Sequence, residues 1–316
     1  MIPTPKVSVC MITFRHADFI SEAIEGILIQ QTKFEVEIII GEDFGGDETR
    51  IICEQYANKY PDKITLLPSS ENLGMMKNFV RTVENATGSY IALCEGDDYW
   101  TDPLKLQKQV DFMESNQDVS LCFHNSEKII YGKKEENSVF SLLEVGEYTP
   151  AQILKNFIIP TASVVFRKKD LVDPNFLLDP RILFGDICLW LHLLEYGKAV
   201  CLEDNMSVYR IHTGSVTTKK LDKLQFQKYL NHYDYLSEKY SATLGDIINT
   251  YRNTIFWVYS MTNFRQKKLG LGFFHLLQIA IRSPLFVLKQ LRDKIKLRIT
   301  NKLVKDKISI RKSFTF

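Results

Sequence analysis

Three acidic residues follow a single apolar segment within four positions. Glu95, Asp97 and Asp98 come directly after residues 90–94 of the chain. Carboxylates this close repel one another, and in a shared site the repulsion raises one pKa unless a cation is present. A divalent ion resolves the conflict, and Mg²⁺ typically takes one or two carboxylates together with substrate phosphates. The spacing indicates such a site, although a solvated acidic turn before Pro103 is an alternative that the cluster alone does not exclude.

Two further segments contain residues of chemical interest. Asp186 precedes the apolar stretch ICLWLHLL, and an aspartate there is typical of a helix N-cap, worth about 1 kcal/mol. Arg210 and His212 follow a strand-like segment, where a histidine is more often structural than catalytic. From the residues alone, a structural role is therefore favoured for both Asp186 and His212.

The elements that must position these residues alternate along the first half of the chain. Apolar β-rich runs alternate with segments whose apolar residues recur at helical spacing, and this predicts an α/β fold with parallel strands and right-handed crossovers. The predicted strands are residues 6–14, 35–43, 63–68 and 89–94, and the predicted helices are residues 20–28, 47–56 and 75–88. Ligands bind beyond the carboxyl ends of such strands, so the acids after residue 94 should meet Glu42, Asp43 and residues 13–16 in one crevice.

The second half of the chain is predicted to be mixed and then helical. Residues 119–126 and 161–168 have the pattern of strands, and residues 149–157 and 185–197 that of helices. Residues 198–212 are predicted to form a strand, a turn and a second strand. From Leu221 onward the pattern is helical, so we expect a first domain over residues 1–218 and a helical region over 219–316.

Charge is distributed unevenly over the 316 residues. The formal net charge is +2, but residues 261–316 carry about +12 and the rest of the chain about −10. The six scattered cysteines form no C-x-x-C pair, which predicts buried thiols in a cytosolic protein. The N-terminus MIPTPK lacks the apolar core of a signal peptide. His275, Arg282 and Pro284 interrupt residues 269–291, which are therefore not expected to span a membrane.

Four motifs in order give the chain a resemblance to a known family. VSVCMITFRHADFISEAIEGILIQQT, EIIIGEDFGGDET, ENLGMMKNFVRTVENATGSYIALCEGDD and the GD of LFGDICLWLHLL resemble the corresponding segments of family 2 glycosyltransferases. The match covers about residues 6–215. The resemblance implies a GT-A fold, in which a Rossmann-like mixed sheet is flanked by helices, here with a basic helical C-terminal extension.

The resemblance also implies roles for individual residues. Glu42, Asp43, Thr13 and Lys77 match positions that contact the nucleotide, and Glu95 and Asp97 match the D-x-D acids that bind the sugar nucleotide. Asp97, Asp98 and His212 would hold Mn²⁺ or Mg²⁺, and Asp186 matches the catalytic base. Two departures are Glu95 in place of the first aspartate of D-x-D, and Gly41-Glu42 in place of Val-Asp.

The implied activity is inverting transfer of a sugar from a nucleotide diphosphate sugar, expected to be a UDP-sugar, to a saccharide hydroxyl. Bacterial cell-surface polysaccharide synthesis is the expected setting. A nucleotidyltransferase would need a glycine-rich loop after the first strand, which TFRHADF lacks. A degenerate sugar-binding protein is the non-enzymatic alternative.

The basic C-terminal region carries a separate expectation. Phe273, Phe274, Leu276, Leu277, Ile279 and Ile281, followed by KQLRDKIKLR, suit a helix on an anionic bilayer, with packing on the enzyme body as the alternative. Nucleic acid is not expected as a partner, because aromatic and basic residues do not interleave there. The expected location is the cytoplasm, with peripheral attachment to the inner face of the cell membrane.

Overall fold

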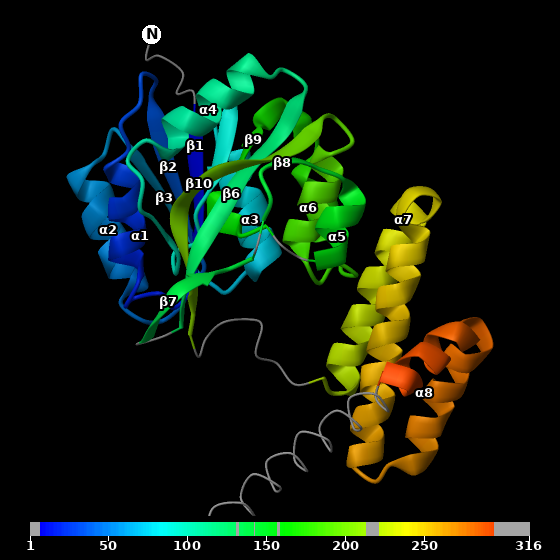
Figure 1. Cartoon of the computed structure of the whole chain (residues 1–316). Coiled ribbons are helices and arrows are strands. Elements are labelled where there is room, and N and C mark those ends of the chain that lie inside the picture. The colour runs from blue at the N-terminus through cyan, green and yellow to red at the C-terminus, as the bar shows by residue number, and fades with distance from the viewer. Residues whose placement is uncertain (1–6, 131–132, 142, 157–158, 213–220, 294–316) are drawn as a thin grey trace, which may run out of the picture. The chain divides into compact units, whose positions relative to one another are not determined.

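The computed structural model describes residues 7–130, 133–141, 143–156, 159–212 and 221–293. The chain divides into two compact units, within residues 1–219 and 220–316 respectively. Figure 1 shows the first unit as a sheet flanked by helices and the second as helices alone. Each unit is described by itself below.

The first unit contains all ten described strands and six α-helices. The strands are β1 (Val7–Thr13), β2 (Val36–Glu42), β3 (Ile64–Pro68), β4 (Tyr90–Leu93), β5 (Tyr99–Trp100), β6 (Val119–Ile130), β7 (Lys133–Val139), β8 (Gly146–Tyr148), β9 (Val165–Arg167) and β10 (Lys198–Ile211). The helices are α1 (Ile20–Leu28), α2 (Thr49–Lys59), α3 (Met75–Glu84), α4 (Lys105–Ser115), α5 (Pro150–Asn156) and α6 (Gly185–Leu193). Three short 3₁₀ helices are Thr161–Ser163, Lys168–Asp170 and Pro174–Leu178.

The strands form one mixed sheet in the order β3-β2-β1-β4-β9-β6-β10-β5, with β7 beside β6 and β8 beside β10. Strands β1 to β4 are parallel, as predicted. Strand β9 is antiparallel to both β4 and β6, so β6 and its parallel neighbour β10 run in the same direction as β1. The carboxyl ends of β1, β2, β4 and β10 therefore lie at the same edge of the sheet.

The side chains of β1 point alternately to the two faces of the sheet, and helices cover both faces. Val7, Val9 and Met11 are fully buried in the larger core, together with apolar residues of α1, α2 and α4. On the other face, the Cys10 thiol donates to the carbonyl oxygen of Thr82 on α3 at 3.9 Å. A strand that is buried on both faces is a nearly continuous apolar run rather than an alternation of apolar and polar residues. Residues 7–12 have such a run.

One predicted turn is absent. Residues 198–211 form a single strand, β10, where a strand, a turn and a second strand were predicted. The pairing with β6 shifts register between Leu202 and Ser207, as in a β-bulge. The bulge absorbs the polar residues Glu203, Asp204 and Asn205 without ending the strand, and Asp204 forms an ion pair with Lys108 at 2.6 Å.

The second unit is a helical bundle. It contains α7 (Lys223–Arg265), α8 (Leu269–Arg282) and a further helix, Pro284–Asp293. Helix α7 turns back on itself, as Figure 1 shows. Phe226 stacks on Tyr259 with ring centroids 4.1 Å apart, although 33 residues of straight helix would span about 50 Å. Ile279 of α8 is 1% exposed and packs into the same aromatic core.

Among the described residues, no single helix has the length and apolar composition needed to cross a membrane. The pair Leu269–Arg282 and Pro284–Asp293 passes that test only when the two helices are taken together, and they are bent by 119° at their junction.

A buried lysine stands out in the core of the first unit. Lys105 is fully buried, and its ammonium group lies 4.1 Å from the centroid of the Trp100 ring. Its Nζ donates to Gln109 Oε1 at 2.7 Å, and no carboxylate ion pair is recorded for it among the described residues. Burial lowers the pKa of Lys105 to about 7. Charged Lys105 therefore costs stability that the neutral form does not.

We predict that Lys105→Met raises the free energy of unfolding at pH 7. The unfolded lysine titrates near 10.5 and the folded one near 7, so the unfolded state binds more protons between these values. Wild-type stability then rises with pH across this window, relative to the variant. Urea unfolding at several pH values should show that the advantage of Lys105→Met shrinks towards pH 10. An advantage that stays constant with pH would contradict the assignment.

Candidate active site

The end of β4 leads into a turn that crosses to β10. Residues 95–98 connect β4 to the two-residue strand β5, which pairs antiparallel with β10 in the register Ser207↔Trp100 and Val208↔Tyr99. This register places the end of β10 beside the acidic turn. The backbone N–H of Arg210 donates to Asp98 Oδ1 at 2.9 Å, and the Arg210 guanidinium donates to the Asp97 carbonyl at the same distance.

The Arg210 side chain also joins the turn to α1. Its guanidinium forms an ion pair with Glu22 of α1. It also lies over the rings of Tyr99 and Phe19, at 4.3 and 5.3 Å from their centroids. Arg210 thereby fixes three segments that are far apart in the sequence.

Three side chains with metal-binding atoms converge at this point. His212 Nε2 lies 3.0 Å from Asp97 Oδ2, and His16 Nε2 lies 3.8 Å from the same oxygen. The three ligand atoms all lie within 4.8 Å of one another. Ligands about 2.1 Å from one ion are at most about 4.2 Å apart, so this cluster fits a divalent ion after small adjustments. His16 Nδ1 is buried, with no hydrogen-bond partner among the described residues.

The surrounding acids shift one another's ionisation. Burial raises the pKa of Glu95, and the charges of Asp97 and Asp186 add to the effect. Burial also opposes ionisation of Asp97, but the hydrogen bond with His212 and the nearby His16 outweigh it and lower the pKa of Asp97. Burial lowers the pKa of His16, although Asp97 opposes the shift. The site thus holds several acids in a poorly solvated place, where a cation would be stabilising.

Asp98 has a different environment from Asp97. It is 1% exposed, and burial raises its pKa well above the ordinary value, with the charges of Asp97 and Glu95 contributing. Its Oδ1 accepts the Arg210 N–H, whereas Oδ2 is buried without a partner among the described residues. Asp98 is not part of the three-residue cluster, and its predicted metal contact remains a prediction.

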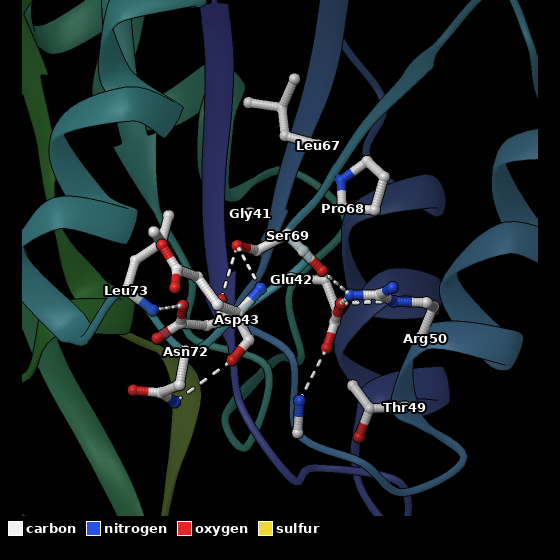
Figure 2. A network of polar contacts seen from close by, with 12 residues as sticks. Gly41, Glu42, Asp43, Thr49, Arg50, Leu67, Pro68, Ser69, Asn72 and Leu73 are labelled. Carbon is white, nitrogen blue, oxygen red and sulfur yellow. Dashed lines mark hydrogen bonds and ion pairs between the residues drawn. The ribbon is translucent and has the colours of Figure 1, made fainter.

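Glu42 at the end of β2 is buried and paired with an arginine. Its carboxylate accepts from Arg50 Nε at 2.7 Å and from the backbone N–H of Gly45 at 3.0 Å, as Figure 2 shows. The Arg50 guanidinium also donates to the carbonyl of Ser69 after β3. No pattern in the sequence indicated this ion pair, which closes the loop after β2 onto α2.

The Asp43 carboxylate binds the start of α3 through backbone groups. It accepts from the N–H of Leu73 at 2.6 Å, as Figure 2 shows. It also accepts from the N–H of Gly74 at 3.0 Å. The hydroxyl of Thr13 is buried at the end of β1, with no hydrogen-bond partner among the described residues. Lys77 is exposed on α3. Their nucleotide contacts stay predictions, but Thr13 and Asp43 lie at strand ends on one edge of the sheet.

Asp186 lies in the first turn of α6 and not at its N-cap, which is Phe184. Gly185 permits a close approach to α3, since a Cβ at this position would lie 2.1 Å from the sulfur of Met76. Asp186 is exposed, yet the protein around it still raises its pKa. Because its charge acts on Glu95, the two carboxylates belong to one electrostatic environment.

Tyr209 is a neighbour of the whole acidic group. Burial raises the pKa of its phenol, and the charges of Asp98, Glu95, Asp97 and Asp186 add to the shift in that order. One side chain near the end of β10 therefore senses all four carboxylates. The residues predicted from three separate segments are brought together, and His16 joins them as a residue for which no individual role was predicted.

Comparison with known proteins identifies the family. The family model described as glycosyl transferase family 2 matches residues 8–170, which is just over half of the chain. The chain belongs to glycosyl transferase family 2. The matched region of this family 2 glycosyltransferase contains β1 to β4, the acidic turn and α4, and it ends before α6 and β10.

Curated relatives match over a longer range. The Escherichia coli protein WfaP, named as a UDP-Glc:α-D-GlcNAc-diphosphoundecaprenol β-1,3-glucosyltransferase, is 30% identical over 220 residues, which is 69% of this chain and 82% of WfaP. The putative teichuronic acid biosynthesis glycosyltransferase TuaG of Bacillus subtilis is 28% identical, with 68% of this chain and 83% of TuaG covered. An uncharacterised Mycobacterium tuberculosis protein is 34% identical over 66% of this chain, but the match spans only 60% of that protein.

Solved structures share the fold. S. aureus TarS 1–349 in complex with UDP-GlcNAc has a TM-score of 0.61 at 18% identity, with 82% of this chain and 74% of the TarS chain covered. The mannosyltransferase PcManGT from Pyrobaculum calidifontis, in complex with GDP-Man and Mn²⁺, has a TM-score of 0.57 at 14% identity, with 94% of this chain and 81% of PcManGT covered. The predicted GT-A fold of this family 2 glycosyltransferase is thus confirmed.

We predict that Arg210→Ala destabilises this family 2 glycosyltransferase by about 1–3 kcal/mol, because the Asp97 carbonyl and two aromatic rings lose a charged partner. Glu22→Gln removes only the exposed half of the ion pair and should cost less than about 1 kcal/mol. Chemical denaturation of both variants measures the difference. Equal losses would mean that the ion pair with α1, and not the contact with the acidic turn, is the stabilising part.

Proposed function

We propose that this family 2 glycosyltransferase is an inverting enzyme that transfers a sugar from a nucleotide diphosphate sugar, specifically a UDP-sugar, to a saccharide hydroxyl. The observations that carry the proposal are the convergence of His16, Asp97 and His212 at the strand ends and the action of the Asp97 and Asp186 charges on Glu95. The UDP complexes of TarS and the UDP-glucose donor in the name of WfaP support the choice of nucleotide.

The donor side of the proposed site lies at the strand ends. Mn²⁺ or Mg²⁺ held by Asp97 and His212 would neutralise negative charge on the departing nucleoside diphosphate. Asp98 is proposed to assist through Oδ2, the oxygen that has no hydrogen-bond partner among the described residues. Glu95 is proposed to contact the sugar nucleotide together with Asp97.

The nucleotide itself is proposed to lie across the ends of β1 and β2. Thr13 and Lys77 are proposed to contact the nucleotide, and Glu42 and Asp43 are proposed to lie beside its nucleobase. The Asp43 carboxylate already accepts two backbone hydrogen bonds, but a carboxylate has about four lone-pair sites and can accept more. The Glu42 carboxylate is already paired with Arg50, so we propose that its main role is to hold the loop after β2 in place.

Asp186 is proposed as the general base. It takes the proton of the acceptor hydroxyl while the acceptor oxygen bonds to the anomeric carbon and the bond from that carbon to the diphosphate oxygen breaks. Attack from the face opposite the leaving group inverts the anomeric centre. The raised pKa of Asp186 makes it a better proton acceptor than a fully solvated aspartate.

The acceptor is proposed to be a saccharide of a bacterial cell-surface polysaccharide such as a capsule or O-antigen, and a lipid-linked one in particular. Two relatives support this setting through their names, which mention teichuronic acid biosynthesis and a diphosphoundecaprenol-linked acceptor. The enzyme would then work in the cytoplasm at the inner face of the membrane.

Incubation with a panel of UDP- and GDP-sugars and Mn²⁺ tests the reaction class. Release of UDP from one donor, faster with acceptor present, is expected. Asp97→Ala should abolish metal-dependent release while leaving the melting temperature close to that of the wild type. Release of a sugar phosphate from the donor would indicate nucleotidyl transfer instead, and binding without any turnover would indicate a sugar-binding protein.

We predict that Asp186→Asn lowers kcat by about 10²–10⁴-fold and changes donor affinity little, because the amide cannot accept the proton. Steady-state kinetics and donor titration by calorimetry separate the two quantities. Asp111→Asn, an exposed change of the same kind on α4, is the matched control and should keep wild-type activity. A variant Asp186→Asn with normal kcat would exclude this residue as the base.

The second unit is proposed to contact an anionic membrane surface. Large exposed apolar residues recur every three or four positions along α8 and the helix after it, namely Leu269, Phe273, Leu277, Ile281, Leu285 and Leu288. Exposed basic residues accompany them, including Lys268, Arg282 and Lys289. Apolar side chains flanked by Lys and Arg suit the interface of a bilayer with acidic lipids. The basic tail beyond Asp293 lies outside the described residues.

Phe274 is exposed beside this stripe, but two residues of the predicted bilayer-facing set face the core of the second unit instead. Ile279 is buried, and Leu276 packs against the aromatic core of the second unit. Helical spacing alone could not separate the two faces of α8, because apolar residues occupy both of them.

Co-sedimentation of the full chain with vesicles containing acidic lipids tests the membrane proposal. The double variant Leu277→Ser and Ile281→Ser should pellet several-fold less than the wild type, since two apolar side chains no longer insert. Leu224→Ser removes a leucine that is also exposed but lies on α7, and it should not change binding. Equal pelleting of all three proteins would reject the apolar stripe as the contact.

A further inference from the structure

The segment between β1 and α1 holds His16 in a fixed backbone conformation. Its N–H donates to Thr49 Oγ1 at 2.8 Å, and its carbonyl accepts from the N–H groups of Phe19 and Ile20 at 2.9 Å each. Neither backbone group of His16 is therefore left to water.

The residue before His16 adopts an uncommon conformation. Arg15 has a φ of +58°, which is in the left-handed region that is unfavourable for side chains other than glycine, asparagine and aspartate. Arg15 Nε donates to the carbonyl of Gly45 at 2.9 Å, and a Cβ on Gly45 would lie 2.8 Å from the Arg15 nitrogen. The loop after β2 thus packs against this turn and supports a backbone state that costs energy.

These backbone contacts set the direction in which the His16 imidazole points. The side chain of His16 is 16% exposed, and its Nε2 lies 3.8 Å from the Asp97 oxygen that His212 also contacts. The rings of His16 and His212 approach edge to face with centroids 6.1 Å apart. Two imidazoles, one after β1 and one after β10, therefore lie beside one carboxylate oxygen.

We propose that His16 is a third protein ligand of the divalent ion and that it makes the site selective for Mn²⁺ over Mg²⁺. The inference rests on the proposed function only in taking the ion to be the one that serves the donor diphosphate. It goes beyond the D-x-D acid and the histidine after β10, because the additional ligand comes from the loop after β1.

The ligand set gives the reason for the selectivity. Mg²⁺ is bound mainly by oxygen ligands and keeps several waters, whereas imidazole nitrogen suits first-row transition ions. One imidazole beside a carboxylate is a modest preference. Two imidazoles with a single carboxylate disfavour Mg²⁺ further, and they leave the remaining positions to donor oxygens and water.

Direct metal binding tests the proposal without reference to turnover. Titration of the full-length protein with Mn²⁺ alone, followed by electron paramagnetic resonance, gives the dissociation constant, and competition with Mg²⁺ gives the selectivity. His16→Ala should raise the Mn²⁺ dissociation constant at least about tenfold. His16→Asp should regain affinity while reducing the Mn²⁺-to-Mg²⁺ preference, because oxygen replaces nitrogen.

His192→Ala is the matched control. This histidine lies on α6 against Phe176 and Tyr196, outside the cluster, and its loss should leave Mn²⁺ binding unchanged. Electron spin echo modulation of the wild type should show two coordinated imidazoles, which settles the ligand count even if His16→Ala folds poorly. A single imidazole, or equal Mn²⁺ affinity in wild type and a folded His16→Ala, would overturn the proposal.

The outcome is distinguishable from that of the proposed function. If the wild-type protein releases UDP from a donor but binds Mn²⁺ through one imidazole, the proposed function stands and the proposal that His16 is a third ligand is rejected. Two imidazoles on Mn²⁺ in a protein that turns over none of the donors would keep the metal site and reject the transferase.

Discussion

The rest of this site is arranged around negative charge at a poorly solvated edge of the sheet. The charges of Glu95, Asp97, Asp98 and Asp186 all act on Tyr209, and burial opposes the ionisation of Glu95, Asp97 and Asp98. The protein offsets part of the charge with Arg210 and the two imidazoles beside Asp97. The remainder is compatible with a divalent ion, so the binding of metal and the ionisation of the acids are coupled.

One short strand, β5, brings the acidic turn to the residues that offset its charge. Because β5 pairs with β10 rather than extending β4, the acidic turn leaves the strand that delivers it and ends beside Arg210 and His212. The nearest partners of Asp97 are therefore about 80 and 115 residues away in sequence. A shift in the pairing of β5 would move Asp97 away from His212 and leave its charge without a partner.

Much of the donor side could be predicted from sequence because it depends on local patterns. Apolar β-rich runs and helical repeats placed β1 to β4 with their helices, and parallel pairing then implied that Thr13, Glu42, Asp43 and Glu95 share an edge. The contact of His16 with Asp97 could not be inferred in this way. It depends on the left-handed turn at Arg15 and on the loop after β2, and neither leaves a periodic signal. Similarly, the bulge in β10 was mistaken for a turn, because a bulge and a turn both favour polar residues.

The two sides of the site differ in how firmly their residues are held. On the donor side, Glu42 and Asp43 accept three or more hydrogen bonds or ion pairs between them, and the backbone of His16 is bonded at both ends. On the other side, Asp186 is exposed, and the neighbouring Gly185 lies close to Met76 of α3. In the proposed mechanism, a rigid donor side would fix the anomeric carbon relative to the metal, and this is where misplacement would be most costly. An open side around the proposed base would admit a bulky saccharide, so differences in acceptor choice among such enzymes should arise near α5 and α6 rather than at the strand ends.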